Sequence, residues 1–195
     1  MSADLPSTLA KLGFRISRTV FDKTIEEATK QRLSPVQVLE RVAEAERRAR
    51  DGVNLARRTR ASKLGAVPAL DTFDWSHPKK IDKALYEQLL RMDFVEKGEN
   101  VLFRGSVGLG KTMLARNLGQ EALRSGYSVR FTTLAGMTAE ILRQESLPAA
   151  TRRLKRYARA DLLVIDELGY LPQDHRAADA LYNVIAERHE RASTI

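Results

Sequence analysis

A glycine-rich octapeptide carries the residue types that bind phosphate: Gly105-Ser106-Val107-Gly108-Leu109-Gly110-Lys111-Thr112. It fits the pattern G-x-x-x-x-G-K-[ST], in which glycines let successive backbone amides point at phosphate oxygens. The apolar residues 100–104 before it indicate a buried strand, and apolar positions recur at helical spacing from Met113 onward. A helix that starts directly after the loop adds partial positive charge at the same place. We therefore predict that residues 105–113, Met113 included, bind the phosphates of a nucleotide.

Two carboxylates, Asp166 and Glu167, follow a second apolar run, 55 residues after Lys111. Nucleotide hydrolysis needs an acid at the end of a neighbouring strand, where it holds Mg²⁺ through water opposite the Thr112 hydroxyl. Asp166 fits that role, and Glu167 fits the general base that polarises the attacking water. An acidic end on an exposed strand is common by itself. Together with the loop, the pair predicts an ATP and Mg²⁺ site.

The composition excludes several classes of protein. The chain has 195 residues, no cysteine and a net charge of +8, so neither disulfides nor thiolate metal sites are expected. It contains no apolar run long enough to cross a membrane, and its first residues lack a basic region followed by an apolar one. We expect a cytoplasmic protein without a membrane partner.

Basic residues gather in two segments. Between Arg41 and Lys63 there are eight cations and three acids, which favours contact with a nucleic-acid backbone over a merely solvated helix face. The candidates for DNA contact here are Arg47, Arg48, Arg50, Arg57, Arg58, Arg60 and Lys63. In the second segment Arg152, Arg156 and Arg159 share one helix face, which fits DNA, the acids of a neighbouring subunit or simple solvation.

The order of elements predicts the domains. Residues 1–66 read as a helical, basic domain for contact with DNA, in which Ser34, Pro35 and Gln37 form a helix start and Val36, Leu39 and Val42 the buried side of that helix. Residues 67–98 form a linker and a helix over about 81–95. Phe73 and Trp75 lie in this stretch; they could flank a base, although buried packing is the commoner fate of such aromatics.

From residue 99 to 195, strands at 100–104, 127–133 and 162–165 alternate with helices at about 111–125, 134–145, 149–159 and 174–191. This alternation predicts an α/β fold, a parallel sheet with helices on both faces, as in P-loop NTPases.

The motifs resemble those of the IstB-type transposition helper ATPases, AAA+ proteins close to the DnaC helicase loaders. The resemblance rests on residues 99–105 leading into the loop and on the string Asp-Glu-Leu-Gly-Tyr-Leu-Pro at 166–172. It extends over nearly the whole chain. By itself the loop would indicate only a P-loop NTPase.

The resemblance implies an ATP-dependent assembly that self-associates, binds target DNA and recruits or activates a transposase. It also implies that the basic N-terminal domain, residues 1–66, contacts DNA or the transposase. It implies that Lys111 contacts the β- and γ-phosphates, Thr112 ligates Mg²⁺, Asp166 holds the metal through water and Glu167 orients the hydrolytic water. Ser106 stands where many relatives carry proline.

A larger departure from the family lies at the end of the chain. Ile195 falls where such proteins enter a fourth core strand, which lies between the first and third strands. We expect a truncated chain whose incomplete AAA+ core leaves these two strands facing each other across a gap. It would bind nucleotide weakly and hydrolyse it poorly.

Two alternatives stay open. A DnaC-like helicase loader would use the same ATPase motifs with a replicative helicase as its partner. A catalytically inactive fragment would act only by binding DNA through its N-terminal residues, although the intact Lys111, Asp166 and Glu167 argue against long decay.

Overall fold

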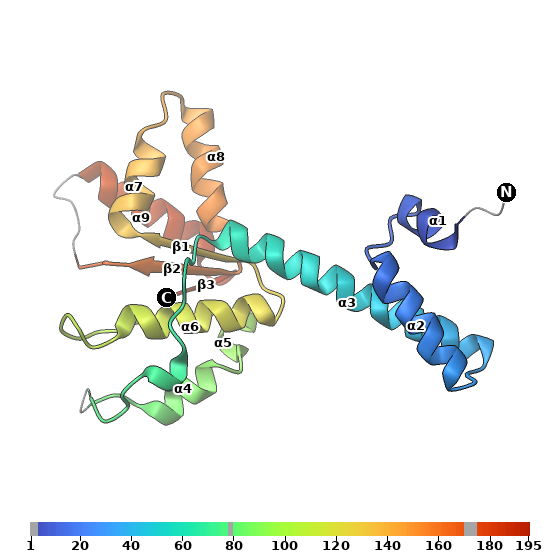
Figure 1. Cartoon of the computed structure of the whole chain (residues 1–195). Helices are drawn as coiled ribbons and strands as arrows, with labels where there is room; N and C mark the ends of the chain where they lie inside the picture. Colours follow the sequence, from blue (N-terminus) through green and yellow to red (C-terminus); the bar gives the residue numbers. More distant parts are fainter. Residues whose placement is uncertain (1–3, 78–79, 170–174) are drawn as a thin grey trace. The chain divides into compact units, whose positions relative to one another are not determined.

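The structure is a computed structural model that describes residues 4–77, 80–169 and 175–195. It divides into two compact units, Met1–Arg57 and Arg58–Ile195. The division falls inside the long helix α3 (Pro35–Ser62), whereas the expected boundary between residues 66 and 67 comes after the end of that helix (Figure 1).

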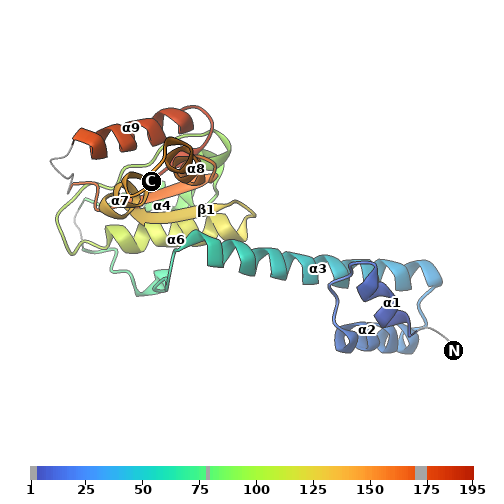
Figure 2. The ribbon, with the colours of Figure 1, turned by 90° about the horizontal axis from the view of Figure 1, so that it is seen from above.

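The first unit is helical. It contains α1 (Leu5–Lys11), α2 (Arg18–Lys30) and the first part of α3, which lie beside one another in Figure 2. The expected helix start at Ser34 is confirmed, because the Ser34 amide donates to Gln37 Oε1 at 2.8 Å and the Gln37 amide donates to Ser34 Oγ at 3.4 Å. This reciprocal pair satisfies two amides that the first turn of a helix leaves free.

The expected buried side of α3 is wrong for two of its three residues. Val36 and Leu39 are 64% and 69% exposed, whereas Val42 is half-buried and Glu46 is buried. The Glu46 carboxylate accepts hydrogen bonds from the amides of Arg15 and Ile16, at 2.7 and 2.8 Å, in the loop between α1 and α2. Because that loop lies against α3 at Glu46, the buried side of the helix starts further along than its apolar residues suggest.

The second unit contains a parallel sheet in the order β1-β2-β3, with β1 (Val129–Thr133), β2 (Leu162–Asp166) and β3 (Ser193–Thr194). Val129 to Thr133 pair in register with Leu162 to Asp166, and Leu162 pairs with Ser193. The expected strands at 127–133 and 162–165 are therefore confirmed with small changes at their ends.

The expected strand at 100–104 does not form. This segment lies beside β3, where the Val101 amide donates to the Thr194 carbonyl at 2.9 Å, but its remaining residues join no ladder and Leu102 is 75% exposed. A strand needs a partner along its length, and β3 has only two residues. Ser193–Ile195 thus occupy the first part of the expected gap between the 100–104 segment and β2.

Helices cover both faces of the sheet, as expected for this fold class (Figure 1). On one face lies α6 (Lys111–Arg124), which contacts α4 (Lys83–Leu89) through a hydrogen bond from the Tyr86 hydroxyl to the Leu114 carbonyl. On the other face lie α7 (Leu134–Leu142), α8 (Leu147–Ala158) and α9 (His175–Arg188). The core on this second face consists of Leu134, Met137, Ile141, Tyr157, Leu163, Ala180 and Val184.

The expected helix at 81–95 is broken into two, α4 and α5 (Asp93–Glu96). Met92 between them has a positive φ of 67°, so the chain turns there. The turn buries Met92, Phe94 and Val95 together, whereas a straight helix would place Phe94 nearly opposite Met92. Tertiary packing therefore overrides the helical spacing of the apolar residues.

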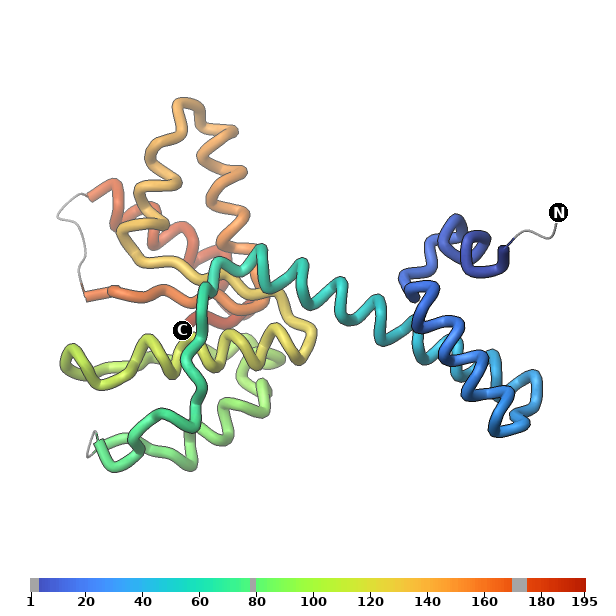
Figure 3. The backbone as a smooth tube through the Cα atoms, in the orientation of Figure 1, coloured from blue at the N-terminus to red at the C-terminus, as the bar shows by residue number. Residues whose placement is uncertain are grey.

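A segment without regular strands joins α3 to α4 through the short 3-10 helix η1 (Leu70–Thr72), and Figure 3 traces it past α6. Side chains of α6 hold it: Arg116 donates to the Ala66 carbonyl at 3.3 Å, and Asn117 donates to the Pro68 carbonyl at 3.0 Å.

Arg188 stabilises the end of the sheet at which β2 and β3 begin. Its side chain is buried, and it donates to the carbonyls of Tyr157, Ala158 and Ala160 at 2.8, 3.1 and 2.6 Å, and to the Ser193 carbonyl. Burial lowers the pKa of Arg188 to about 10, so the guanidinium stays charged at neutral pH. Carbonyls from the end of α8 and from β3 thus share one buried cation.

No helix in the described ranges is long and apolar enough to cross a membrane.

Candidate nucleotide-binding site

A cavity of about 1210 Å³ opens in the second unit at the end of β2. The phosphate loop and the 100–104 segment line it, together with the end of β2 and the α9 residues Leu181 and Ile185. The loop, Asp166 and Glu167 supply its polar groups, and a pocket of mainly apolar lining with a few convergent polar groups is typical of a small-molecule site.

The loop has the backbone conformation that phosphate binding needs. Gly108 and Gly110 have φ values of +85° and +75°, and α6 begins at Lys111 directly after them. Residues with side chains rarely adopt this conformation, whereas glycine does so readily. The amides of the first turn of α6 therefore face the loop, where an anion finds both hydrogen-bond donors and the positive end of the helix dipole.

Lys111 reaches back across the loop. Its Nζ donates to the carbonyls of Gly105 and Ser106 at 2.8 and 2.7 Å. The ammonium group therefore lies inside the curl of the loop, where it can exchange these carbonyls for phosphate oxygens.

The two motifs meet at Thr112 and Asp166. Thr112, in the first turn of α6, donates from Oγ1 to Asp166 Oδ1 at 3.1 Å, and Asp166 is the last residue of β2. The hydroxyl and carboxylate that the sequence assigned to one metal ion are thus in contact. This is the geometry on which the interpretation of both motifs depends.

Glu167 has an unusual backbone. Its φ is +58°, and its amide donates to the carboxylate of Asp166 at 2.9 Å. A left-handed conformation costs a residue with a side chain about 1–2 kcal/mol, and such strain is concentrated at functional sites. The turn leaves the Glu167 side chain exposed at the edge of the cavity.

These residues fit a nucleotide with Mg²⁺. Among the described residues no three acidic, histidine or cysteine side chains come together as a metal cage. Mg²⁺ does not need one, since it is held by one or two protein oxygens, water and the phosphates themselves. Thr112 and Asp166 supply such oxygens beside the loop.

Phe73 and Trp75 pack as a cluster and are absent from the residues that line the cavity. Phe73 is buried, and its ring centroid lies 4.8 Å from that of Trp75. An added Cβ on Gly110 would lie 2.5 Å from Cε2 of Phe73. Packing, rather than contact with a base, is therefore the role of Phe73 and Trp75 in this structure. Glycine is needed at position 110 for two reasons: its φ is positive, and a Cβ there would collide with the Phe73 ring.

The N-terminal basic candidates are largely occupied by contacts within the protein. Arg47 and Arg48 both pair with Glu44, and Arg50 pairs with Glu46 at 2.5 Å. The two arginines hold the pKa of Glu44 down at about 2. Arg58 donates to the Leu123 carbonyl. Arg57 and Arg60 are exposed and form no ion pair with the described residues.

The C-terminal basic candidates are free of acids. Arg152 and Arg156 on α8 and Arg159 at its end are exposed, and none forms an ion pair within the described ranges. Glu140 of α7 instead pairs with Arg153 at 3.4 Å and with Lys63 at 3.3 Å. Lys63, directly after α3, and Arg153 of α8, far apart in the sequence, therefore meet at one carboxylate.

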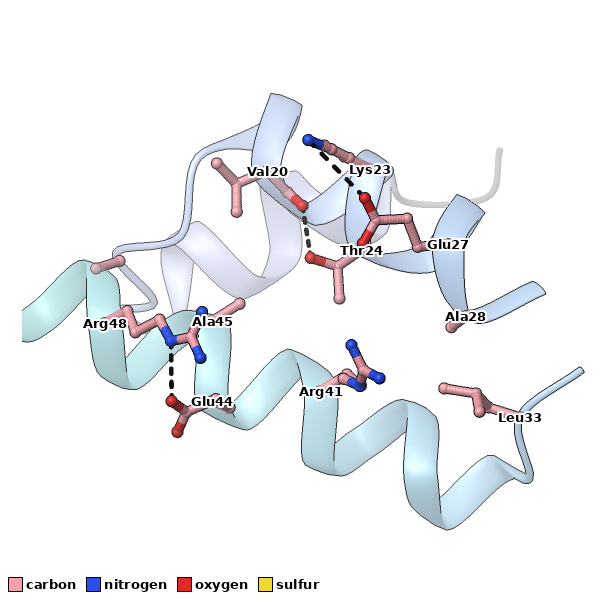
Figure 4. Close-up of a pocket in the computed structure, with 11 residues that line it drawn as sticks. Val20, Lys23, Thr24, Glu27, Ala28, Leu33, Arg41, Glu44, Ala45 and Arg48 are labelled. Atoms are coloured by element: carbon pink, nitrogen blue, oxygen red, sulfur yellow. Dashed lines mark hydrogen bonds and ion pairs between the residues drawn. The ribbon is translucent and has the colours of Figure 1, made fainter. Parts of the chain in front are cut away.

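A second hollow, of about 500 Å³, lies in the first unit between α2 and α3 (Figure 4). Its charged lining residues are mostly paired with each other, Lys23 with Glu27 and Arg48 with Glu44. Arg41 lies opposite Ala28 and Leu33 in this view. No glycine lines this hollow, so it lacks the phosphate-loop features of the cavity in the second unit.

Comparison with known proteins agrees with this geometry. Residues 7–195 match the model of the family described as IstB-like ATP binding protein. The chain belongs to this family. A protein named for ATP binding in insertion sequence IS5376 of Geobacillus stearothermophilus is 33% identical over 170 residues, covering 87% of this chain and 68% of the relative. One from insertion sequence IS21 of Pseudomonas aeruginosa is 30% identical, covering 89% of this chain and 66% of the relative.

This IstB-like chain therefore spans about two thirds of the length of these relatives. Of the string at 166–172 that suggested the family, Tyr170, Leu171 and Pro172 lie outside the described residues. The sequence reasoning overlooked Arg104, which lines the cavity. Its place directly before Gly105 was the only signal of this.

Proposed function

We propose that this IstB-like chain binds ATP with Mg²⁺ in the cavity at the phosphate loop and hydrolyses it as the ATPase core of a transposition helper. The contact between Thr112 and Asp166 carries the proposal, because it joins the two motifs in one site. The loop amides and Lys111 would hold the β- and γ-phosphates, and Thr112 and Asp166 would hold the metal. Bound Mg²⁺ would neutralise charge that develops on the phosphates.

Glu167 would act as the general base. It follows Asp166 directly and is exposed at the edge of the cavity, so water can reach its carboxylate. A positioned carboxylate of this kind contributes about 10²–10⁴-fold to a rate. Glu167→Gln should therefore bind ATP like the parent chain and lose hydrolysis.

The site assignment is tested by titration with a fluorescent ATP analogue in the presence of Mg²⁺. Lys111→Ala should abolish binding, because it removes the cation inside the loop. Arg124→Ala is the matched control, since Arg124 lies at the other end of α6 and pairs there with Glu121. Unchanged affinity in Lys111→Ala would falsify the assignment.

DNA is the proposed nucleic-acid partner, and α8 is the surface that the contacts favour. Arg152, Arg156 and Arg159 pair with no acid among the residues that the structure describes, whereas Arg47, Arg48 and Arg50 each pair with one. Phosphate contacts by arginine release counterions, so such binding weakens steeply with salt. Replacing Arg152, Arg156 and Arg159 with alanine should lower the affinity for duplex DNA. It should also reduce the salt dependence of binding by the equivalent of about three phosphate contacts. Replacing Arg47, Arg48 and Arg50 should do less.

The partner protein is proposed to be a transposase, and self-association on DNA is proposed with it. The relatives are named as proteins of insertion sequences, which supports this choice. ATP, DNA and such partners meet in the cytoplasm, where we place the chain. Affinity capture with the tagged chain should recover a transposase. Recovery of a replicative helicase instead would favour a helicase loader.

A further inference from the structure

The nucleotide cavity is lined by two cations, Arg104 and Lys111, and by two carboxylates, Asp166 and Glu167. Two of these four groups already have partners: Lys111 bonds to loop carbonyls, and Asp166 accepts hydrogen bonds from Thr112 and from the Glu167 amide. Arg104 forms no hydrogen bond or ion pair with any residue that the structure describes. It is the cavity's free positive charge within the described ranges.

The register of the sheet gives the position of Arg104 along the site. In these parallel pairs an amide bonds to the carbonyl just before its partner residue, as the Ser193 amide does to Asp161 while Ser193 pairs with Leu162. The Val101 amide bonds to the Thr194 carbonyl, so Val101 is level with Ile195.

The hydrogen bonds of Ile195 with Leu163 and Ile165 place it level with Val164. Arg104 and Glu167 each lie three residues beyond this level on their own segments, and both line the cavity. Exposure alternates along this segment: Leu102 and Arg104 are exposed, whereas Val101 and Phe103 are half-buried. Leu102 and Arg104 thus project to the same side of their segment.

We propose that Arg104 binds the terminal phosphate of the nucleotide and so distinguishes ATP from ADP. The inference rests on the proposed ATP site. A phosphate chain that begins at the loop and ends beside Glu167 brings its last phosphate to the level of Arg104. A planar guanidinium donates two parallel hydrogen bonds to such a group, which an ammonium cannot do. In ADP no phosphate reaches that level.

The test compares the affinities of ATP and ADP, with Mg²⁺, for the parent chain and for Arg104→Ala, Arg104→Lys and Arg124→Ala. Arg104→Ala should weaken ATP binding about ten-fold or more, the size expected for a lost charged hydrogen bond. Its ADP affinity should change by less than about three-fold. Arg104→Lys should recover part of the loss, and Arg124→Ala, which removes the same charge elsewhere, should match the parent.

The outcomes separate this inference from the site assignment. If Arg104→Ala weakens ATP and ADP equally, or neither, Arg104 does not bind the terminal phosphate, although the site stands. If the parent chain binds no nucleotide, both the site and the role of Arg104 are wrong. Equal melting temperatures of the parent and Arg104→Ala without nucleotide would show that the loss of ATP affinity is not a loss of folding.

Discussion

Thr112 Oγ1 lies 3.1 Å from Asp166 Oδ1, although 54 positions separate the two residues in the sequence. The contact links the first turn of α6 to the end of β2. A hydroxyl and a carboxylate that already touch require little rearrangement to share one hydrated ion. The affinity for nucleotide should therefore depend on the metal through Asp166.

Asp166→Asn should remove that dependence. The amide keeps a hydrogen-bond acceptor for Thr112 but loses the negative charge that attracts Mg²⁺. Chelation of Mg²⁺ should lower the ATP affinity of the parent chain markedly and that of Asp166→Asn little, as measured by titration with a fluorescent ATP analogue. Asp161→Asn, at the residue directly before the other end of β2, is the control and should behave like the parent.

Gly110→Ala should destabilise the second unit more than Gly108→Ala. Both glycines have positive φ, so both substitutions strain the backbone. Only the Cβ at 110 meets another atom, Cε2 of Phe73 at 2.5 Å; at 108 nothing lies within 4 Å. Overpacking of this kind costs about 1–3 kcal/mol, which urea unfolding would measure.

The collision with Phe73 can be isolated by a double-mutant cycle. Phe73→Ala should reduce the extra cost of Gly110→Ala, because the ring that the new methyl meets is gone. Additive effects of the two substitutions would show that the difference between Gly110 and Gly108 has another cause.

Nucleotide binding should change the fluorescence of the single tryptophan. Trp75 contacts Phe73, and Phe73 packs on Gly110 of the loop. A nucleotide that orders the loop alters this packing. Emission should shift on titration with ATP and stay constant in Lys111→Ala. A constant signal in a parent chain that binds ATP would show that the cluster does not sense the loop.

Arg188→Met should destabilise the protein by about 3–5 kcal/mol, as expected when a buried charged group is removed from its partners. The carbonyls of Tyr157, Ala158 and Ala160 would lose their donor inside the protein. Arg191→Met, which changes an exposed arginine three residues later, should alter the free energy of unfolding by less than about 0.5 kcal/mol. Chemical denaturation of both variants checks this.

Glu46 should make the first unit sensitive to acid. Burial raises the pKa of Glu46, but hydrogen bonds from Arg50 and from the amides of Ile16 and Arg15 outweigh it, and the net pKa lies below the ordinary value of 4.5. Its contribution to stability is therefore present above pH 4.5 and is lost as the pH falls below that value.

Thermal melting of the parent chain should accordingly show a fall in stability on acidification that is smaller in Glu46→Gln. Glu26→Gln is the control, because the carboxylate of Glu26 is exposed and pairs only with Lys30. Equal pH dependence in the parent chain and Glu46→Gln would contradict the role of Glu46.

Features that depend on neighbouring residues could be predicted from the sequence. The loop at 105–112 needs glycines at set positions, the helix start at Ser34 needs Gln37 one turn later, and Asp166 needs only the apolar run before it. These follow from backbone geometry and local hydrogen bonds. The family and the α/β class followed from them.

Features that depend on distant residues were settled by tertiary contacts. Residues 100–104 have strand composition, but a strand also needs a partner of matching length, and β3 offers two residues. The contacts of each arginine depend on which acid or carbonyl the fold brings close to it. Arg188 is buried and bonds to backbone carbonyls, whereas Arg156 is exposed and pairs with no described residue. Composition states which groups a chain carries, but pairing and burial depend on positions in space, and only the folded chain supplies those.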